Sequence, residues 1–371
     1  MTPMKVCHLT SAHESTDVRI FRKECVSLAA AGYETYLVAR GESREERGVH
    51  VVGVGQAPEG RLQRMTTFAR TVYRRALELD ADLYHIHDPE LLPYARKLKR
   101  RGKKVIFDSH ENAPAQIAEK RYLPGPARRL VSALYKASET RTTRQLDAVV
   151  VPCTFDGVNI FAGRAKRVCY LANYPILEDF RPPEDRTLSG EEICYVGGLT
   201  YSRGIRQLVE GTALAGKRLL LVGSFADEAF ARELRSLPAY ACVNYRGEVP
   251  NARVGETIAH CVAGANTILD IGQYHHIDAF GVKVYEYMAL GLPVLLFDSP
   301  FNRAMAEKYG FAVCVKADDP ASIAKGIRSL CDNPETARRM GENGRRAVEE
   351  EFNWKTQETR LLALYRELLG E

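Results

Sequence analysis

The sequence predicts an α/β fold made of two domains, each built on a doubly wound parallel sheet. Short apolar runs alternate with amphipathic segments along most of the 371 residues, which is typical of parallel strands covered by helices on both faces. A segment rich in proline and acids, LANYPILEDFRPPEDRTLSGEE (171–192), interrupts this alternation. The chain is also too long for one core of ordinary size. Two domains joined by a linker follow from these observations.

The first domain is expected to span residues 1–178. Its segment DVRIFRKECVSLAAAG (17–32) has the apolar spacing of a helix and ends at a glycine, as helices commonly do. The apolar runs around that segment predict buried strands, namely KVCHLT, YETYLVA, HVVGV, DLYHIH, KVIFDS and DAVVVP.

A linker is expected over 179–191 and a second domain over 192–350. Strand-like runs resume there, again with helical segments between them, as EICYVGG, KRLLLVGS, ACVNYRG, NTILDIG, PVLLFDS and FAVCVKA. The closing residues, 351–371, are helical in character, and we expect them to pack back towards the N-terminal domain.

Composition is that of an ordinary water-soluble globular protein, with 45% hydrophobic and 27% charged residues. No run of about 18 uncharged apolar residues predicts a transmembrane helix. The N-terminus has no apolar stretch typical of a secretion signal. The nine cysteines are scattered without a CxxC pair, which favours buried thiols in a reducing compartment. We therefore expect a cytoplasmic protein.

Charge is unevenly distributed along the chain. Residues 1–178 hold 29 Lys and Arg against 20 Asp and Glu, a net charge of +9, whereas the remainder holds 23 against 27, a net charge of −4. The basic half fits an anionic substrate or the inner face of the cell membrane. A solvated basic face without a partner explains it equally well. Nucleic acid is not expected, because the basic runs match no nucleic-acid-binding module.

Ligands of such sheets bind beyond the carboxyl ends of the strands. After one predicted strand, the sequence VGGLTYSRGIRQLVEG (196–211) places Gly197 and Gly198 in a turn and Arg203 at the start of a helix. Glycines let a ligand approach the backbone, and a helix N-terminus and an arginine both bind phosphate. The alternative is a plain strand-to-helix turn with an exposed arginine.

A second such turn is HHIDAFGVKVYEYMALGLPV (275–294), where a helix is predicted to start near Phe280 and Gly281. Its first amides, including that of Val282, offer another phosphate site. Glu286 lies inside the helix, where it fits a ribose diol, and Asp278 precedes it, where it fits sugar hydroxyls. If the whole stretch were helical, the two acids would stand roughly 12 Å apart.

Each of these residues also has a purely structural explanation. Asp278 fits a helix cap, and Lys283 and Glu286 have the spacing of an ion pair along one helix face. Lys283 could equally reach a phosphate or the sugar.

The chain resembles glycosyltransferase family 4, whose members have the GT-B fold. The resemblance rests on the acid-x7-Glu spacing, on KVYEYMALGLPV, VGGLTYSRGI and FNWKTQETRLLALYREL, and on HLTSAHESTDVRIFRKECVSLAAAGYE, DLYHIHDPELLP and KVIFDSHE. These N-terminal stretches resemble bacterial enzymes that build surface polysaccharides. The chain departs from the family in Asp278, normally a glutamate, in Gly198, normally basic, and in the first loop.

The resemblance implies an α/β, GT-B architecture, in which two Rossmann-like doubly wound domains face each other across a cleft. It implies a retaining hexosyltransferase that takes a sugar from a nucleotide diphosphate donor, a UDP-sugar in preference to GDP-mannose. The acceptor would be a glycan or lipid-linked glycan. The alternatives are a sugar-nucleotide epimerase or hydrolase of the same shape, and a scaffold protein that has lost activity.

The resemblance places His110 beneath the donor sugar, and the expected site follows from it together with the turns above. The expected catalytic residues are His110, Asp278, Arg203 and Lys283. The expected donor-binding residues are Gly197, Gly198, Arg203, Phe280, Gly281, Val282, Lys283 and Glu286. The acceptor-side candidates, taken from the loops after the strands, are His13, Arg19, Asp88, Glu90 and Glu111.

No cofactor and no metal are expected, since GT-B enzymes generally need none. His85 and His87 alternate along a predicted strand and so share one face. A metal site would need a third ligand, and the sequence offers no candidate at a persuasive spacing.

Overall fold

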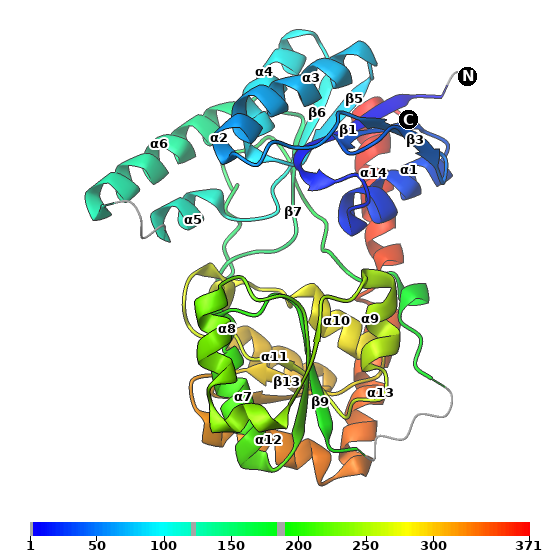
Figure 1. Cartoon of the computed structure of the whole chain (residues 1–371). Coiled ribbons are helices and arrows are strands. Elements are labelled where there is room, and N and C mark those ends of the chain that lie inside the picture. The colour runs from blue at the N-terminus through cyan, green and yellow to red at the C-terminus, as the bar shows by residue number, and fades with distance from the viewer. Residues whose placement is uncertain (1–2, 120–123, 184–189) are drawn as a thin grey trace. The chain divides into compact units, whose positions relative to one another are not determined.

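The computed structural model describes residues 3–119, 124–183 and 190–371 (Figure 1). The chain divides into two compact units. Unit 1 comprises Met1–Asn173 and Lys355–Glu371, and unit 2 comprises Tyr174–Trp354. The structure therefore groups the C-terminal helix with unit 1. Residues 184–189 of the predicted linker lie outside the described residues.

Unit 1 is built on an eight-stranded sheet in the order β3-β4-β2-β1-β5-β6-β7-β8. Strand β1 pairs in parallel with both β2 and β5, so Val6 stands opposite Thr35 on one side and Leu83 on the other. Every neighbouring pair is parallel except β3 with β4. The strands are β1 (Lys5–Glu14), β2 (Glu34–Arg40), β3 (Arg44–Glu46), β4 (Val49–Gly53), β5 (Leu83–Ile86), β6 (Lys104–Asp108), β7 (Ala148–Val151) and β8 (Val168–Tyr170).

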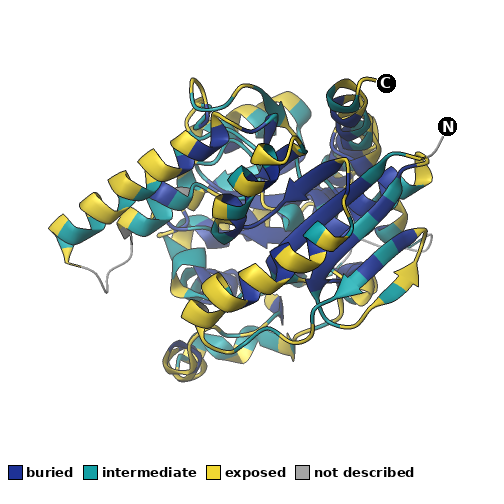
Figure 2. Cartoon of the chain, turned by 90° about the horizontal axis from the view of Figure 1, so that it is seen from above, coloured by how far each residue is buried: buried dark blue, intermediate teal, exposed yellow. Residues whose placement is uncertain are grey.

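Helices cover this sheet, and Figure 2 shows buried strands beside helices whose outward faces are exposed. The first, η1 (Val18–Cys25), is a π-helix capped by Asp17, whose carboxylate accepts a hydrogen bond from the Ile20 amide at 2.9 Å. The others are α1 (Val26–Ala30), α2 (Arg61–Gln63), η2 (Arg64–Phe68), α3 (Ala69–Glu78), η3 (Pro89–Leu91), α4 (Leu92–Arg100), α5 (Ala113–Glu119) and α6 (Gly125–Thr143). The last helix of the chain, α14 (Trp354–Leu369), contacts β1 and β5 through Tyr365.

Unit 2 holds a six-stranded parallel sheet in the order β11-β10-β9-β12-β13-β14. Its strands are β9 (Glu192–Val196), β10 (Arg218–Val222), β11 (Val243–Gly247), β12 (Gly264–Asn266), β13 (Val294–Phe297) and β14 (Ala312–Val315). The order reverses at β9, so the loops after β9 and β12 emerge side by side. This is the place where open α/β sheets bind ligands.

The helices of unit 2 pack against the two faces of that sheet, in separate apolar clusters. They are η4 (Leu177–Asp179), η5 (Tyr201–Arg203), α7 (Ile205–Ala215), α8 (Glu228–Arg235), η6 (Pro238–Cys242), α9 (Asn251–Ile258), η7 (Gln273–His276), α10 (Val282–Ala289), α11 (Pro300–Tyr309), α12 (Pro320–Cys331) and α13 (Pro334–Glu350).

One predicted strand, NTILDIG, is misplaced. Strand β12 ends at Asn266, where that run begins. Ile268 and Leu269 instead pack beyond the sheet, in a small cluster with Phe297 and Ala317. The run is apolar because it fills this cluster, not because it pairs with neighbouring strands.

Candidate functional site

In unit 2, two glycine-rich strand ends border a pocket of about 560 Å³. Gly197, directly after β9, has a φ of 127°, and a side chain at Gly223 would overlap the carbonyl oxygen of Gly197. The Gly197 amide also donates to the Val222 carbonyl at 2.9 Å. Gly198 lines the same pocket, and a Cβ added there would meet only open space. Small residues thus leave the backbone accessible at the mouth of the sheet.

Arg203 and Lys283 meet at this glycine although they come from different turns. A Cβ built on Gly197 would stand 3.1 Å from Nη1 of Arg203 and 3.1 Å from Nζ of Lys283. Arg203 ends η5, immediately before the Gly204 cap of α7, and Lys283 lies in the first turn of α10. Two predicted cationic residues therefore converge on one backbone position.

The Lys283 ammonium is buried beside an aromatic ring. Its Nζ has no hydrogen-bond partner within the described part of the chain and lies 3.7 Å from the ring centroid of Tyr195. Burial, followed by the charge of Arg203, holds the pKa of Lys283 well below its ordinary value, and Glu286 opposes this shift. A phosphate at this position would satisfy both cations.

Helix α10 begins at Val282 with Gly281 as its N-cap, close to the predicted start. Gly281 is exposed, with open space where a Cβ would be, so the first amides of the helix are accessible. The phenyl ring of Phe280 is buried against Tyr285 and Phe311. Phe280 therefore fixes the turn, and only its backbone is available to a donor.

The estimate of roughly 12 Å between Asp278 and Glu286 assumed a continuous helix and does not apply. Asp278 lies in a bend after η7 (Gln273–His276), and the chain becomes helical again only at Val282. Both carboxylates are partly exposed, and Glu286 remains inside the helix as expected.

In unit 1, a pocket of about 290 Å³ opens beyond the carboxyl ends of β5 and β6. Four of the predicted residues line it: His13, Asp88, His110 and Glu111. Glu90 lies outside it, and its carboxylate accepts a hydrogen bond from Ser11 at 3.2 Å and pairs with Arg64 at 3.3 Å.

Asp88 organises the second half of β1. Its Oδ2 accepts hydrogen bonds from the Thr10 hydroxyl at 2.7 Å, the Ser11 amide at 2.6 Å and the Ala12 amide at 3.2 Å. The other oxygen, Oδ1, stands 3.6 Å from Nε2 of His13. The Asp88 carboxylate thus fixes the backbone of β1 at Ser11 and Ala12 and also contacts the His13 imidazole, which lines the pocket.

His13 is also held by Asp17, whose Oδ2 lies 3.3 Å from its Nδ1. Burial lowers the pKa of His13, but the hydrogen bond to Asp17 and the charges of Asp88, Asp17 and Asp108 outweigh that effect and raise it. Burial raises the pKa of Asp17, yet its bonds to His13 and the Ile20 amide lower that pKa to about 2.

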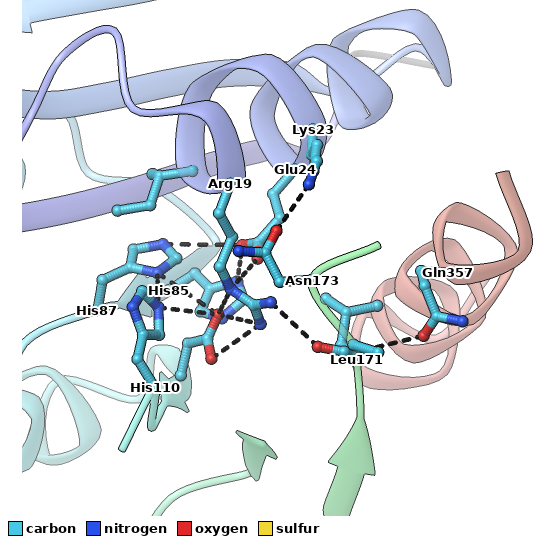
Figure 3. Close-up of polar contacts among 12 residues, drawn as sticks. Arg19, Lys23, Glu24, His85, His87, His110, Leu171, Asn173 and Gln357 are labelled. Carbon is cyan, nitrogen blue, oxygen red and sulfur yellow. Dashed lines mark hydrogen bonds and ion pairs between the residues drawn. The ribbon is translucent and has the colours of Figure 1, made fainter. Parts of the chain in front are cut away.

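Arg19 is buried and does not line the pocket, so direct contact with an acceptor would require the fold to open (Figure 3). Its guanidinium donates two hydrogen bonds to Oδ2 of Asp108, at 2.8 and 3.0 Å, and one to the Leu171 carbonyl at 3.1 Å. Arg19 is buried because the buried carboxylate of Asp108 would be costly without a counter-charge.

Sequence reasoning did not single out Tyr195 or Asp108. Tyr195 sits in an apolar strand run, EICYVGG, where nothing marks its ring as the neighbour of Lys283. Asp108 ends the strand before His110, and its Oδ2 lies 3.4 Å from Nε2 of that histidine. An acid at the end of a buried strand, two residues before a candidate histidine, was the available signal.

Two family models match most of the chain. Residues 19–159 match the model described as Glycosyltransferase Family 4, and residues 178–347 match the model described as Glycosyl transferases group 1. The chain is a glycosyltransferase. A comparison with curated protein sequences finds no match.

Solved structures confirm the GT-B fold expected for this glycosyltransferase. Sucrose-phosphate synthase from Thermosynechococcus elongatus superposes with a TM-score of 0.77 at 18% identity, over 99% of each chain. Anabaena HepE in complex with UDP-glucose gives a TM-score of 0.71 at 14% identity, over 98% of this chain and 100% of its own. Trehalose-6-phosphate synthase, studied for glycosyl transfer with retention, gives 0.67 at 13%, over 99% of each chain.

The unit 2 site suits the electrostatic work of a glycosyltransferase. Transfer from a nucleotide diphosphate leaves negative charge on the departing phosphate, which cations and amides already in place stabilise most strongly. Arg203, Lys283 and the first amides of α10 are such groups. The unit 1 pocket, lined by carboxylates and imidazoles, suits sugar hydroxyls.

Proposed function

We propose that this glycosyltransferase is a retaining hexosyltransferase of family 4, using a nucleotide diphosphate sugar, with a UDP-sugar favoured over GDP-mannose. The convergence of Arg203 and Lys283 on Gly197 carries this proposal. A buried ammonium without a hydrogen-bond partner in the described residues is costly unless an anion reaches it. A diphosphate that bonds to both cations removes that cost.

In the proposed reaction, the bond between the anomeric carbon and the phosphate oxygen breaks while an acceptor hydroxyl attacks from the same face. The acceptor's proton passes to the departing phosphate oxygen, so no enzymic nucleophile is consumed. Glu286 holds the ribose, while Arg203, Lys283 and the amides of Gly281 and Val282 hold the diphosphate. Asp278 holds the sugar hydroxyls. The step uses neither a metal nor a cofactor.

The ligands of solved structures with this fold support this assignment. HepE has been solved with UDP-glucose, and trehalose-6-phosphate synthase was studied as an enzyme that transfers with retention. A UDP-hexose is therefore the first donor to test, and the acid at Asp278 is one methylene shorter than the family's glutamate.

We assign the acceptor to the class of glycans or lipid-linked glycans of bacterial surface polysaccharides. The pocket lined by His13, Asp88 and Glu111 supports hydroxyl recognition. Helix α6 exposes Leu130 and Leu134, with 61% and 62% of their surfaces accessible, on a stretch that also carries basic residues. Apolar and basic side chains together favour contact with the anionic inner face of the cell membrane from the cytoplasmic side.

None of the described helices has the length and the apolar run that a bilayer crossing requires.

Thermal stability measured with UDP, GDP and their sugars tests the donor, because a ligand of the native state raises the melting temperature. We expect UDP-hexoses to give the largest rise. Incubation of the stabilising donor with and without acceptor then separates the activities. Free sugar or an epimer formed without acceptor would favour a hydrolase or epimerase, and no stabilisation by any nucleotide would favour a scaffold.

A further inference from the structure

Four metal-ligand side chains meet in the core of unit 1, beneath the pocket described above: His87 reaches that pocket, and its Nδ1 lies 3.4 Å from Nε2 of His110. His8 lies on β1, Glu24 on η1, and His85 and His87 on or directly after β5. All four side chains have no solvent exposure, and one ligand atom of each lies within 4.8 Å of the others. Figure 3 shows Glu24 beside the histidines. The sequence indicated only His85 and His87 as possible ligands. The other two, His8 and Glu24, lie far from them in the sequence.

The Glu24 carboxylate faces three imidazoles at a common distance. Its Oε2 lies 3.7 Å from Nδ1 of His8, 3.9 Å from Nδ1 of His85 and 3.8 Å from Nε2 of His87. These separations are too long for hydrogen bonds. Ligands about 2.1 Å from one tetrahedral ion stand roughly 3.4 Å apart. An ion would draw Glu24 inward and separate His8 from His87, whose nitrogens are 2.9 Å apart.

Several polar atoms of this cluster are unsatisfied. Neither carboxylate oxygen of Glu24 has a hydrogen-bond partner among the described residues. The same is true of Nε2 of His85. Arg19 contributes only an ion pair, with its Nε 3.2 Å from Oε1 of Glu24. Buried polar groups are nearly always bonded to protein, water or an ion. A missing ligand accounts for these unpaired atoms together.

Outer contacts already orient these side chains. The Tyr365 hydroxyl lies 2.9 Å from Nε2 of His8 and 2.9 Å from Nδ1 of His85. Oδ2 of Asp108 lies 3.6 Å from Nδ1 of His87. Metal-binding histidines and carboxylates usually have such partners, which fix the ring orientation and the tautomer. In His8 and His87 the nitrogen that faces Glu24 is the one opposite the outer contact, whereas His85 presents to Glu24 the same Nδ1 that Tyr365 contacts.

We propose that His8, Glu24, His85 and His87 bind one divalent transition-metal ion, of the class represented by Zn²⁺. Three imidazoles and a carboxylate match the ligands and coordination number of Zn²⁺. All four positions come from protein and none opens to solvent, so the ion is structural and takes no part in glycosyl transfer. It links β1, η1 and β5, and through Tyr365 it supports the packing of α14.

The metal content of the full-length, tag-free protein tests this proposal. Protein produced in Zn²⁺-supplemented medium and dialysed against a weak chelator should retain about one equivalent of metal by mass spectrometry. Unfolding and refolding with Zn²⁺ rather than with a strong chelator should raise the melting temperature by about 5 to 10 °C. Refolding with Co²⁺ should give the visible absorption of a tetrahedral site.

Glu24→Gln should lose the metal and the Zn²⁺-dependent rise, whereas His50→Ala, at a partly exposed histidine of β4, should keep both. If Glu24→Gln does not fold, the Co²⁺ spectrum of the unmodified protein tests the proposal, since a tetrahedral site should give visible absorption. Substoichiometric metal, no Zn²⁺ effect after refolding and no tetrahedral Co²⁺ band would show a metal-free hydrogen-bonded cluster and overturn the proposal.

Discussion

Lys283 points its ammonium at the face of Tyr195, 3.7 Å from the ring centroid. The ring's negative face stabilises a cation, but it cannot accept the strong hydrogen bonds that the buried ammonium lacks. The Lys283 ammonium is therefore unfavourable in the free protein, and a bound phosphate would relieve this cost. If unit 2 binds a nucleotide as proposed, this arrangement connects the stability of unit 2 to its affinity for that nucleotide.

Lys283→Met should raise the stability of the free protein and weaken UDP binding by about 10- to 100-fold. The pKa of Lys283 is lowered in the folded state, so the unfolded chain binds more protons and stability rises with pH between the folded and unfolded pKa values. Methionine carries no charge, so the variant does not have the free-energy cost of burying an ammonium. Chemical denaturation and calorimetry measure both effects, and lower stability of the variant would contradict the prediction.

UDP binding to the unmodified enzyme should take up a proton, since the phosphate favours charged Lys283. Affinity is then expected to fall as pH rises above the lowered pKa of Lys283 in the free enzyme. Calorimetry in buffers of different ionisation enthalpy measures the uptake. Lys283→Met should bind without it; uptake that persists in this variant would assign the proton to another group.

Arg203→Ala should weaken UDP by about 10- to 100-fold and leave uridine almost unchanged, because the lost charged hydrogen bonds reach only the diphosphate. Arg206→Ala is the matched control in the adjoining helix α7, since Arg206 pairs with Glu210 and Glu233 instead. Equal losses for UDP and uridine would exclude a phosphate contact.

Glu286→Ala should reduce UDP affinity by about 10-fold, the worth of a charged hydrogen bond to the ribose. It should have little effect on 2′,3′-dideoxy-UDP, which lacks the diol. Comparing the two ligands isolates the ribose contact from any disturbance of α10. Glu256→Ala, on an exposed position of α9, should change neither affinity. A similar loss for both ligands would discard the ribose assignment.

Local patterns predicted most of this fold because buried parallel strands are continuous apolar runs. Strands β3 and β8 were missed for the same reason. They lie at the sheet edges, and Arg44–Glu46 and Val168–Tyr170 are partly or fully exposed. The run NTILDIG was wrongly predicted to be a strand, because its apolar residues Ile268 and Leu269 fill a small cluster after the end of β12.

The candidate site was predictable only where chemistry and turn geometry coincide in a short stretch. Gly197 and Arg203 lie in a strand-to-helix turn, and Gly281 and Lys283 lie at the start of α10, so their types and positions could be read together. The burial of Arg19 could not be foreseen, because Asp108 comes 89 residues later. The cluster around Glu24 likewise depends on strand order, which no local pattern specifies.

Stability should fall as pH rises above about 6.5 partly because His13 loses its charge. The folded pKa of His13 is raised above 6.5, and that of Asp17 is lowered from 3.8 to about 2. The pair therefore stabilises the fold fully between those unfolded values, and the contribution is lost at higher pH through His13 and at lower pH through Asp17. Asp88, Asp108 and His110 also face His13.

Asp17→Asn keeps an acceptor for the Ile20 amide but removes the charge and the oxygen that face His13, so it should lower the pKa of His13 in an NMR titration. Glu42→Gln, an exposed acid, should leave it unchanged. An unaltered His13 pKa in the Asp17 variant would mean that the other acids alone determine it.

Gly204→Ala should destabilise unit 2 far more than Gly216→Ala, although the two glycines have nearly the same φ, 68° and 69°. At Gly216 an added Cβ meets nothing within 4 Å, so only the left-handed backbone is penalised, by about 1 kcal/mol. At Gly204 the Cβ would overlap the Thr267 carbonyl oxygen, which forces η5 and β12 apart and adds roughly 2 kcal/mol or more. That shift also moves Arg203, so UDP affinity should fall in Gly204→Ala and persist in Gly216→Ala. Chemical denaturation measures the stability of both variants, and calorimetry measures their UDP affinity. Equal stabilities would mean that Gly204 and Thr267 are not packed as closely as described.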